Sequence, residues 1–263
     1  MFLAIGIDNA RITFGVYRGR TLITTFEIAS DRLKTADEYA YTIHGILRLH
    51  EVVPEAIHHC MISSVVAPLS PIIANAIEKL CEISPVFVGP GIKTGLNIKI
   101  DNPAQLGSDI VALTVGAIAK YRAPLILLDL GIVTTMSVVN AAGVFCGTII
   151  MPGMHAALGA LIDTAGSLPA ISIEPPKALI GTNTVDSMRS GIVNGTCAML
   201  DGLIDKILLD QHCEKTPSIV ATGDLAAAIA PLCTHPITLD ATLLMDGLCH
   251  LHHKNALHPK KGQ

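Results

Sequence analysis

The sequence lacks any uninterrupted apolar run long enough to form a membrane-spanning helix. Its longest apolar stretch, residues 110–136, is interrupted by Lys120, Arg122, Pro124 and Asp129, whereas a spanning helix needs about 20 consecutive apolar residues. No basic residues precede the apolar residues at the N-terminus, so we expect a first β-strand there and not a signal peptide. These absences argue against a membrane protein.

An excess of positive charge is also missing. The net charge is −4 and the isoelectric point is near 6.2, so the chain has no basic footprint of the kind that binds nucleic acid or anionic membranes. We therefore expect its partners to be small molecules or other protein chains, with no nucleic acid and no membrane among them.

The cysteines show no pairing pattern. They are scattered, odd in number and without a Cys-x-x-Cys pair: Cys60, Cys81, Cys146, Cys197, Cys213, Cys233 and Cys249. A disulfide framework is therefore not expected, and the pattern favours reduced core thiols in a cytoplasmic protein.

Aliphatic residues, by contrast, are abundant. Half of the 263 residues are hydrophobic and the mean hydropathy is +0.53, which suits a layered α/β protein with buried strands. The length allows one large domain or two of ordinary size.

Histidines gather near the end of the chain, at His250, His252, His253 and His258. No cysteine or carboxylate stands at ligand spacing beside them, so we expect a polar helix end followed by a loose tail. A structural metal at these histidines is the alternative.

The same order of predicted elements occurs twice along the chain. Each half opens with three strand patterns separated by turns, at residues 2–8, 12–17 and 21–28 in the first half and at 125–128, 134–140 and 145–151 in the second. Helices and short buried strands follow in both halves. The repeat predicts two duplicated α/β domains with a cleft between them, at residues 1–122 and 123–255, followed by a tail at 256–263. A chance match of two β-rich segments is the competing interpretation.

At the first turn, the two halves carry similar residues in opposite order. Placing residue 129 on residue 6 aligns Gly6-Ile7-Asp8-Asn9 with Asp129-Leu130-Gly131-Ile132. A tight turn of small residues lets backbone N–H groups reach phosphate oxygens, and an acid at the strand end can hold a cation beside them. Residues 129–135 have this layout, with hydroxyl groups at Thr134 and Thr135. An ordinary strand-ending turn explains the same residues equally well.

Asp109 follows Gly107 and Ser108 where a helix is predicted to begin. An acid in this position favours the helix through its dipole, which is a purely structural role. The same carboxylate, if it lies beside a substrate, is placed to accept a proton from a hydroxyl group. Thr184 stands at the start of the long helical stretch 185–208, where its residue type is that of an ordinary helix cap.

Many short segments match one family in a single order and at matching spacing. They are the opening strand and turn, Thr35–Glu38, Ser63–Val66, Lys93–Leu96, Asp101–Pro103, Leu106–Asp109, Asp129–Thr135, Ile150–Gly153, Ile180–Gly181, Ser190–Ile192 and Ala221–Gly223. Taken together they resemble the type III pantothenate kinases, of the superfamily of sugar kinases, actin and heat-shock chaperones. The resemblance extends to about Asn255.

The resemblance implies two RNase H-like domains of the actin-like ATPase kind. It also implies ATP-dependent phosphorylation of pantothenate to 4'-phosphopantothenate, the first step of coenzyme A biosynthesis, in a cytoplasmic homodimer. The cofactors would be a divalent cation with ATP, magnesium above all, and a monovalent cation, potassium or ammonium.

The site residues are carried over from the family position by position. Asp109 resembles the general base and Asp129 the monovalent-cation ligand. The residues that resemble ATP contacts are Gly6, Asp8, Asn9, Ala10, Arg11, Gly131, Ile132, Thr134 and Thr135. Those that resemble substrate contacts are Ile100, Gly107, Ser108, Ile110 and Thr184.

Several of these positions depart from the family pattern. The family's opening turn reads Asp-x-Gly-Asn-Thr, and of the residues Gly6, Asp8, Asn9 and Ala10 only the asparagine agrees. Ser108-Asp109-Ile110 stands where the family has Ala-Asp-Arg, Ile100 where it has Tyr, and Ile132 where it has Thr. Each lost contact to a transition state typically costs about 2–4 kcal/mol.

Two hypotheses follow from these departures. In the first, the chain is an active kinase in which Asp8 still coordinates metal-bound ATP, Asp109 is the base and Asp129 holds the cation. In the second, it is a weak or inactive homologue that acts as a binding or regulatory protein, or as a subunit beside an intact paralogue. A separate idea is that Arg11 supplies compensating positive charge to the phosphates.

Overall fold

The computed structural model describes residues 1–210 and 215–256. The described chain packs as two compact units. The first contains Met1–Gly95, Asn102–Ala119 and the segment from Thr242, and the second contains Leu96–Asp101 and Lys120–Ala241. This division differs from the contiguous domains expected at 1–122 and 123–255, because two segments pack with the unit that is distant from them in sequence.

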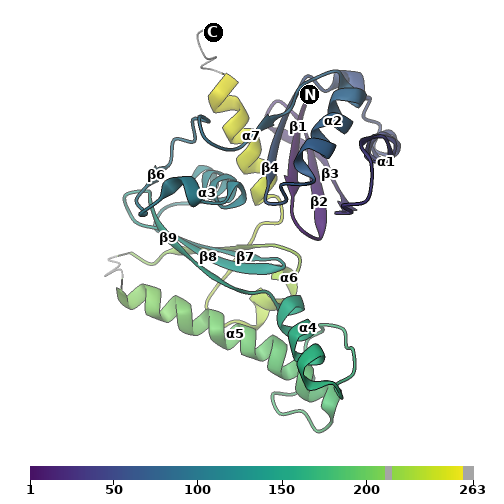
Figure 1. Ribbon diagram of the computed structural model, residues 1–263. Coiled ribbons are helices and arrows are strands. Elements are labelled where there is room, and N and C mark those ends of the chain that lie inside the picture. The colour runs from purple at the N-terminus through teal and green to yellow at the C-terminus, as the bar shows by residue number, and fades with distance from the viewer. Residues whose placement is uncertain (211–214, 257–263) are drawn as a thin grey trace. The chain divides into compact units, whose positions relative to one another are not determined.

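The first unit is built on a five-stranded sheet with the order β3-β2-β1-β4-β5 (Figure 1). Its strands are β1 (Phe2–Ile7), β2 (Arg11–Arg18), β3 (Thr21–Ala29), β4 (His59–Ser64) and β5 (Val86–Phe87). The first three strands form an antiparallel meander, and β4 and β5 continue the sheet from β1 in parallel. The three strands of the meander lie where the sequence predicted strands, at residues 2–8, 12–17 and 21–28.

Alternate residues of β1 face two different helical layers. Leu3, Ile5 and Ile7 join the core formed with α1 (Ala36–Leu49) and α2 (Ser70–Cys81). A capping box between Thr35 and Glu38 fixes the start of α1, since each residue's side chain bonds the other's backbone N–H group.

The opposite face of β1 is covered by α7 (Leu243–Ala256), which lies against β1 and β4 (Figure 1). This helix also touches the backbone of α3 (Ser108–Lys120). A Cβ added at Gly247 would lie 1.9 Å from the carbonyl oxygen of Ala112, so only glycine permits this approach. The sequence predicted a helix end near residue 250 but not its return to the first sheet.

One histidine of α7, His252, lies against the first sheet. His252 stacks on Phe2 with 4.4 Å between ring centroids, and His59 and His253 are its ring neighbours. His258 lies outside the described residues. Within the described ranges, no group of three or more His, Cys, Asp or Glu side chains is arranged to hold a metal ion.

The packing of His252 predicts acid sensitivity. Burial, followed by the neighbouring His59 and His253, lowers the pKa of His252 from 6.5 to about 4. The unfolded chain therefore binds a proton at this site that the folded chain does not bind between about pH 6.5 and 4. The free energy of unfolding should fall as the pH falls through that window. The substitution His252→Phe keeps the ring stack but removes the titrating group. In urea titrations, we expect the free energy of unfolding of this protein to decrease less between pH 6.5 and 4 than that of the parent chain.

An equal decrease in both proteins would contradict this account. The control is His58→Gln, a substitution of an exposed histidine.

The second unit repeats the strand order of the first. Its sheet has the order β11-β10-β7-β8-β9-β6, so β9-β8-β7-β10-β11 corresponds to β3-β2-β1-β4-β5, and β6 is added beyond β9. The strands are β6 (Asn97–Ile98), β7 (Leu125–Leu130), β8 (Val133–Val139), β9 (Val144–Pro152), β10 (Ser218–Thr222) and β11 (Thr238–Leu239). The directions of pairing also agree, which confirms the predicted duplication.

The described residues of the second unit form three α-helices: α4 (Met154–Ala165), α5 (Thr184–Asp210) and the short α6 (Ala226–Ile229). Of these, α5 runs along the sheet and α4 packs against α5 (Figure 1). Buried residues of α5, among them Val193, Leu200 and Ile204, form a core with β7 and β10. Three 3₁₀ turns complete the described structure: Pro54–Ala56, Pro103–Gln105 and Ala230–Leu232. None of the described helices is both long and apolar enough to cross a membrane.

Candidate active site

The turn between β1 and β2 is closed by the carboxylate of Asp8. The backbone N–H groups of Ala10 and Arg11 donate to Asp8 Oδ1 at 2.6 and 2.8 Å, and the N–H of Asp8 donates to the carbonyl of Arg11 at 3.0 Å. A phosphate-binding turn offers such N–H groups to its ligand. Here the chain's own anion already occupies two of them.

Gly6 lies at the end of β1 in the register that Asp129 has in β7. Gly6 pairs with Thr13 and Ser63, and Asp129 pairs with Thr135 and Thr222. The alignment of residue 129 with residue 6 therefore holds in three dimensions.

The space beside Gly6 is taken by α7. A Cβ added at Gly6 would lie 2.7 Å from Leu244 Cδ2 and 3.2 Å from Met245 Cε. An aspartate at position 6 would require Leu244 to move. Side chains of α7 therefore fill the space that an aspartate at position 6 would need. The acidic residue of this turn is at position 8.

Two arginines reach the turn. Arg11 Nη1 forms an ion pair with Glu27 Oε2 at 3.1 Å. Arg32 Nη2 donates to Asn9 Oδ1 at 3.0 Å. The sequence motifs pointed to Arg11 and Asn9, whereas Arg32 lies in the loop after β3, outside any motif.

Asp109 lies in the first turn of α3, in the first unit, with Asp8 close enough to influence it. Burial raises the pKa of the Asp109 carboxyl, backbone hydrogen bonds from Ile110 and Asp109 lower it, and the negative charge of Asp8 raises it further. The net direction is upward. A carboxylate with a raised pKa is a stronger proton acceptor, as a general base requires.

The start of α3 is tied to the end of β4 by hydroxyl groups. Ser108 Oγ lies 2.9 Å from Ser63 Oγ, accepts from the N–H of Ser64 at 3.1 Å and donates to the Ser64 carbonyl at 3.1 Å. Ser70 Oγ donates to Ser64 Oγ at 2.8 Å. This network fixes the backbone immediately before Asp109. The segment Ser63–Val66 matched the family, but its contact with Ser108 was not foreseen.

Gly107 leaves room for the carboxylate of Asp109. A Cβ at position 107 would lie 2.3 Å from Asp109 Oδ1. We expect Gly107→Ala to displace this carboxylate and to lower kcat by about 10²-fold or more, because a misplacement of about 1 Å has that cost.

The kinetic constants of the Gly107→Ala protein for the phosphorylation that the resemblance implies test this expectation. Gly45→Ala on α1 is the matched control, since no described atom lies within 4 Å of a Cβ placed there. Unchanged kcat in Gly107→Ala would show that the position of the carboxylate does not limit turnover.

The second turn, between β7 and β8, is enclosed by two glycines. The N–H of Gly153 donates to the carbonyl of Ile132 at 3.0 Å, and a Cβ there would lie 2.3 Å from the carbonyl oxygens of Gly131 and Ile132. A Cβ at Gly223 would lie 2.8 Å from Asp129 Oδ1. A Cβ at Gly131 would lie 3.7 Å from the same oxygen, so two glycines lie beside the carboxylate of Asp129.

The remaining predicted residues of the second unit have different surroundings. Thr134 is buried at 1% exposure, Thr135 pairs with Asp129 across the strands, and Ile132 is 37% exposed. Ile100 is partly buried and follows β6. Of the predicted substrate contacts in the first unit, Ile110 is buried at 8% exposure.

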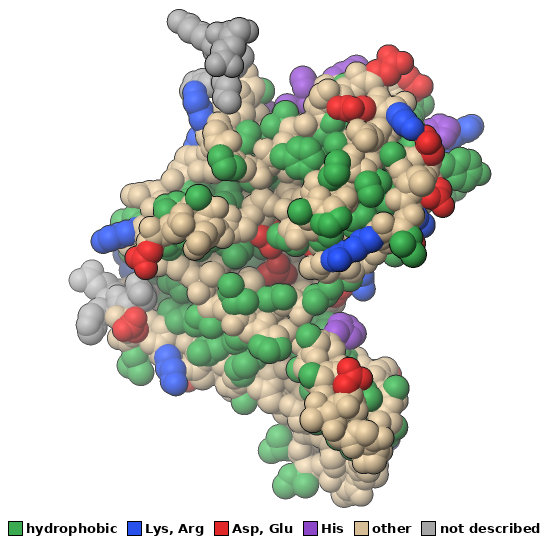
Figure 2. All heavy atoms as spheres, viewed as in Figure 1, with side chains coloured by type: hydrophobic (Ala, Val, Ile, Leu, Met, Phe, Trp, Pro, Cys, Tyr) green, Lys and Arg blue, Asp and Glu red, His purple; other side chains and the backbone are tan. Residues whose placement is uncertain are grey.

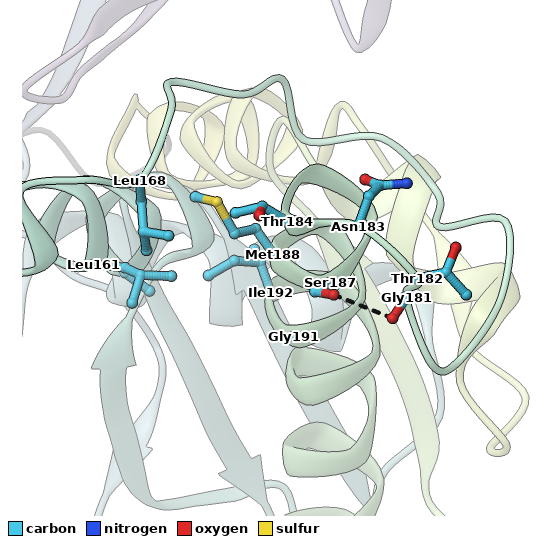
Figure 3. Close-up of a pocket in the computed structure, with 11 residues that line it drawn as sticks. Leu161, Leu168, Gly181, Thr182, Asn183, Thr184, Ser187, Met188, Gly191 and Ile192 are labelled. Atoms are coloured by element: carbon cyan, nitrogen blue, oxygen red, sulfur yellow. Dashed lines mark hydrogen bonds between the residues drawn. The ribbon is translucent and has the colours of Figure 1, made fainter.

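Thr184 opens α5 beside a pocket of about 760 Å³. In Figure 3 the side chains of Leu161, Leu168, Met188 and Ile192 point toward one another at its apolar end. Ser187 Oγ donates to the carbonyl of Gly181 at 3.3 Å and holds the loop before the helix. The pocket lies between α4 and α5, and the sequence predicted only its Thr184 edge.

The fold is shared with solved structures that have little sequence similarity to the chain. An activator of 2-hydroxyisocaproyl-CoA dehydratase from Clostridium difficile, solved with bound ADPNP, aligns with a TM-score of 0.59 at 10% identity, over 100% of this chain and 98% of that one. A protein described as a 2-dehydro-3-deoxygalactonokinase from Sinorhizobium meliloti aligns with a TM-score of 0.57 at 10% identity, over 100% and 99%. The duplicated sheets therefore have the fold of the actin-like ATPases and sugar kinases, as predicted.

Sequence comparison identifies the family. Residues 2–206 match the type III pantothenate kinase family. The type III pantothenate kinase of Geobacter sp. is 36% identical over 97% of this chain and 100% of its own length. That of Halalkalibacterium halodurans is 37% identical over the same shares. The chain belongs to the type III pantothenate kinase family.

Proposed function

We propose that this protein transfers the γ-phosphoryl group of ATP to pantothenate, which yields 4'-phosphopantothenate and ADP in the first step of coenzyme A biosynthesis. The observation that carries the proposal is the family match, at 36% identity over nearly the whole chain. The partly buried carboxylate of Asp109, with its raised pKa, supplies the chemistry that such a reaction needs.

In this proposal Asp109 is the general base. The substrate hydroxyl attacks the γ-phosphorus, the bond to the leaving ADP breaks, and Asp109 accepts the hydroxyl proton. Gly107 gives the carboxylate its space, and Ser108 holds the start of the helix against β4. Ile100, Ile110 and Thr184 are the further positions that we propose as substrate contacts.

The carboxylates of Asp8 and Asp129 are suitable ligands for the divalent and monovalent cations of the proposal. Oxygen ligands suit magnesium, and a carboxylate accepts about four hydrogen bonds or metal contacts in total. Asp8 Oδ1 already accepts two N–H groups, so Asp8 keeps capacity for the divalent cation of ATP. That cation would neutralise phosphate charge. Asp129, enclosed by Gly131 and Gly223, is the proposed ligand of a monovalent cation.

A specific observation favours the alternative function. The carboxylate of Asp8 places negative charge where phosphate should approach, and its backbone donors are already used. In the alternative function, a chain with this turn binds nucleotide weakly and serves as a regulatory protein or as a subunit beside an intact paralogue. The two functions differ in whether the isolated chain turns over.

We also propose a cytoplasmic homodimer. Leu179 and Ile180 are 73% and 80% exposed, next to the pocket at Thr184. Apolar side chains reach the surface over the second unit in Figure 2. Exposed apolar groups beside a pocket are typical of an interface between protein chains. Analytical ultracentrifugation gives the mass in solution.

The experiment for the proposed function is a direct assay. Purified protein at high concentration is incubated with ATP, magnesium, potassium and pantothenate, and 4'-phosphopantothenate and ADP are measured by mass spectrometry. We expect both products in equal amounts and neither without pantothenate. If no product forms, the kinase proposal fails for the isolated chain. Product that appears only when an intact paralogue is added would establish the subunit alternative.

A further inference from the structure

We propose that Arg32 is the residue that binds the phosphates of the nucleotide in this protein. This inference rests on the proposed kinase function and adds to it a binding residue outside the motifs of the sequence. It follows from how the loop after β3 is attached to the turn between β1 and β2.

The loop is attached to the turn on the N-terminal side of Arg32. The N–H of Ser30 donates to the carbonyl of Ala10 at 2.9 Å, and Ser30 Oγ donates to the carbonyl of Asp8 at 2.6 Å. Two carbonyls of the turn are therefore bonded to one residue of the loop. Any movement of the turn carries the loop with it.

The loop is also attached to α1. The N–H of Asp31 donates to Tyr39 Oη at 2.8 Å, and Tyr39 Oη donates to the carbonyl of Asp31 at 2.8 Å. Tyr39 is fully buried. The N–H of Leu33 donates to Asp31 Oδ1 at 2.9 Å. Arg32 thus projects from a short segment whose backbone is held on both sides.

The charges at the turn require a cation. Asp8 uses the N–H groups of Ala10 and Arg11, so the backbone offers less to phosphate than a turn of this kind usually does. A triphosphate near Asp8 meets a like charge unless cationic groups offset it. We expect a cationic side chain at the turn to add to the positive charge of the divalent cation that accompanies ATP.

Of the two arginines at the turn, Arg32 is better suited to this role. Arg11 is paired with Glu27, whose other oxygen accepts from Thr13 Oγ1 at 3.3 Å. Within residues 1–210 and 215–256, no carboxylate pairs with Arg32, and its guanidinium bonds the neutral amide of Asn9. A phosphate that approaches Arg11 must compete with a carboxylate, whereas one that approaches Arg32 competes only with an amide oxygen.

The guanidinium group also has the geometry for the task. It presents its N–H donors in a planar fork that matches two phosphate oxygens, and such charge-assisted bonds are the stronger kind. Asn9 Oδ1 orients this fork before the nucleotide arrives. Arg32 is exposed, so little of its hydration must be lost when phosphate binds.

The test is nucleotide binding by substituted proteins. The dissociation constant of the magnesium complex of β,γ-imido-ATP is measured by calorimetry for the parent chain, Arg32→Ala, Arg32→Lys and Arg11→Ala. We expect Arg32→Ala to weaken binding about 10- to 100-fold, with Arg32→Lys between it and the parent because lysine keeps the charge but not the fork. Arg11→Ala should change binding less than Arg32→Ala does. Arg20→Ala, exposed at the opposite end of β2 and β3, is the control and should bind as the parent does.

The outcomes separate this inference from the proposed function. If the parent binds the nucleotide and phosphorylates pantothenate while Arg32→Ala binds equally well, the inference is overturned and the kinase function stands. If the parent binds no nucleotide, both fail. Thermal unfolding of each protein checks that it folds. Should Arg32→Ala not fold, the comparison of Arg32→Lys with the parent decides, since equal binding by these two would exclude a role for the fork.

Discussion

Replacement of Asp109 by asparagine is expected to lower kcat for pantothenate phosphorylation by about 10²–10⁴-fold, the range over which a positioned proton acceptor acts. Asparagine has the same shape as aspartate and can still accept the backbone N–H groups of Ile110 and residue 109. It cannot accept the proton of the substrate hydroxyl. The affinity for nucleotide should therefore change little while kcat falls.

The pH dependence offers a second measurement of the same role. Burial, together with the charge of Asp8, moves the pKa of Asp109 above the ordinary 3.8 of an aspartate. The base is active when ionised, so kcat/KM should rise with pH through this raised pKa and then level. Asp8→Asn removes the neighbouring charge and should move the rise to lower pH.

The matched control for Asp109 is the exposed carboxylate of Asp163 on α4. Asp163→Asn should leave kcat and its pH dependence unchanged. Full turnover by Asp109→Asn would exclude Asp109 as the base and would direct attention to other carboxylates of the chain.

Gly223→Ala is expected to destabilise the second unit by about 3 kcal/mol or more. Gly223 has φ +95°, a conformation that side chains avoid, and a Cβ there would lie 2.6 Å from the carbonyl carbon of Leu130 and 2.7 Å from its nitrogen. Backbone strain and overpacking each cost about 1–3 kcal/mol. Because the contacted atoms belong to the backbone of β7, they cannot move aside independently.

Gly143→Ala separates these two contributions. Gly143 also has a positive φ, +75°, but no described atom lies within 4 Å of a Cβ placed there. Urea unfolding of this protein should show only the strain, about 1 kcal/mol. If the two substitutions cost the same, close packing at Gly223 contributes nothing to stability.

Much of the fold follows from the sequence because its strands are long and buried. The runs at Phe2–Ile7 and Leu125–Leu130 are apolar on both faces of their sheets, and the turns that follow them share a common pattern. The duplication was therefore visible in the order of the elements alone. Strands β6 and β11 were not predicted, since two paired residues give no periodic signal.

Only those residues of the candidate site that lie in sequence motifs could be predicted. Asp109 and Asp129 stand out in sequence as acids two residues from a glycine, one where a helix is predicted to begin and one where a strand is predicted to end. The sequence could not show why position 6 is a glycine, because the residue that packs against it, Leu244, comes from a helix more than 200 residues further along the chain. Arg32 was also hidden, since its position depends on the bonds of Ser30 to the turn. Contacts between segments distant in sequence leave no local pattern.

The return of α7 to the first sheet has a consequence for the order of folding during synthesis. Residues 120–241 of the second unit are all synthesised before α7. The first unit still lacks Leu244 and Met245 against Gly6 at that stage, and its β1 face is open to solvent. Domains generally fold as they emerge, with the N-terminal one first. In this protein, we expect the unit that begins first to be completed last. Until α7 packs on it, the first sheet exposes apolar residues to which a chaperone that recognises apolar strands can bind.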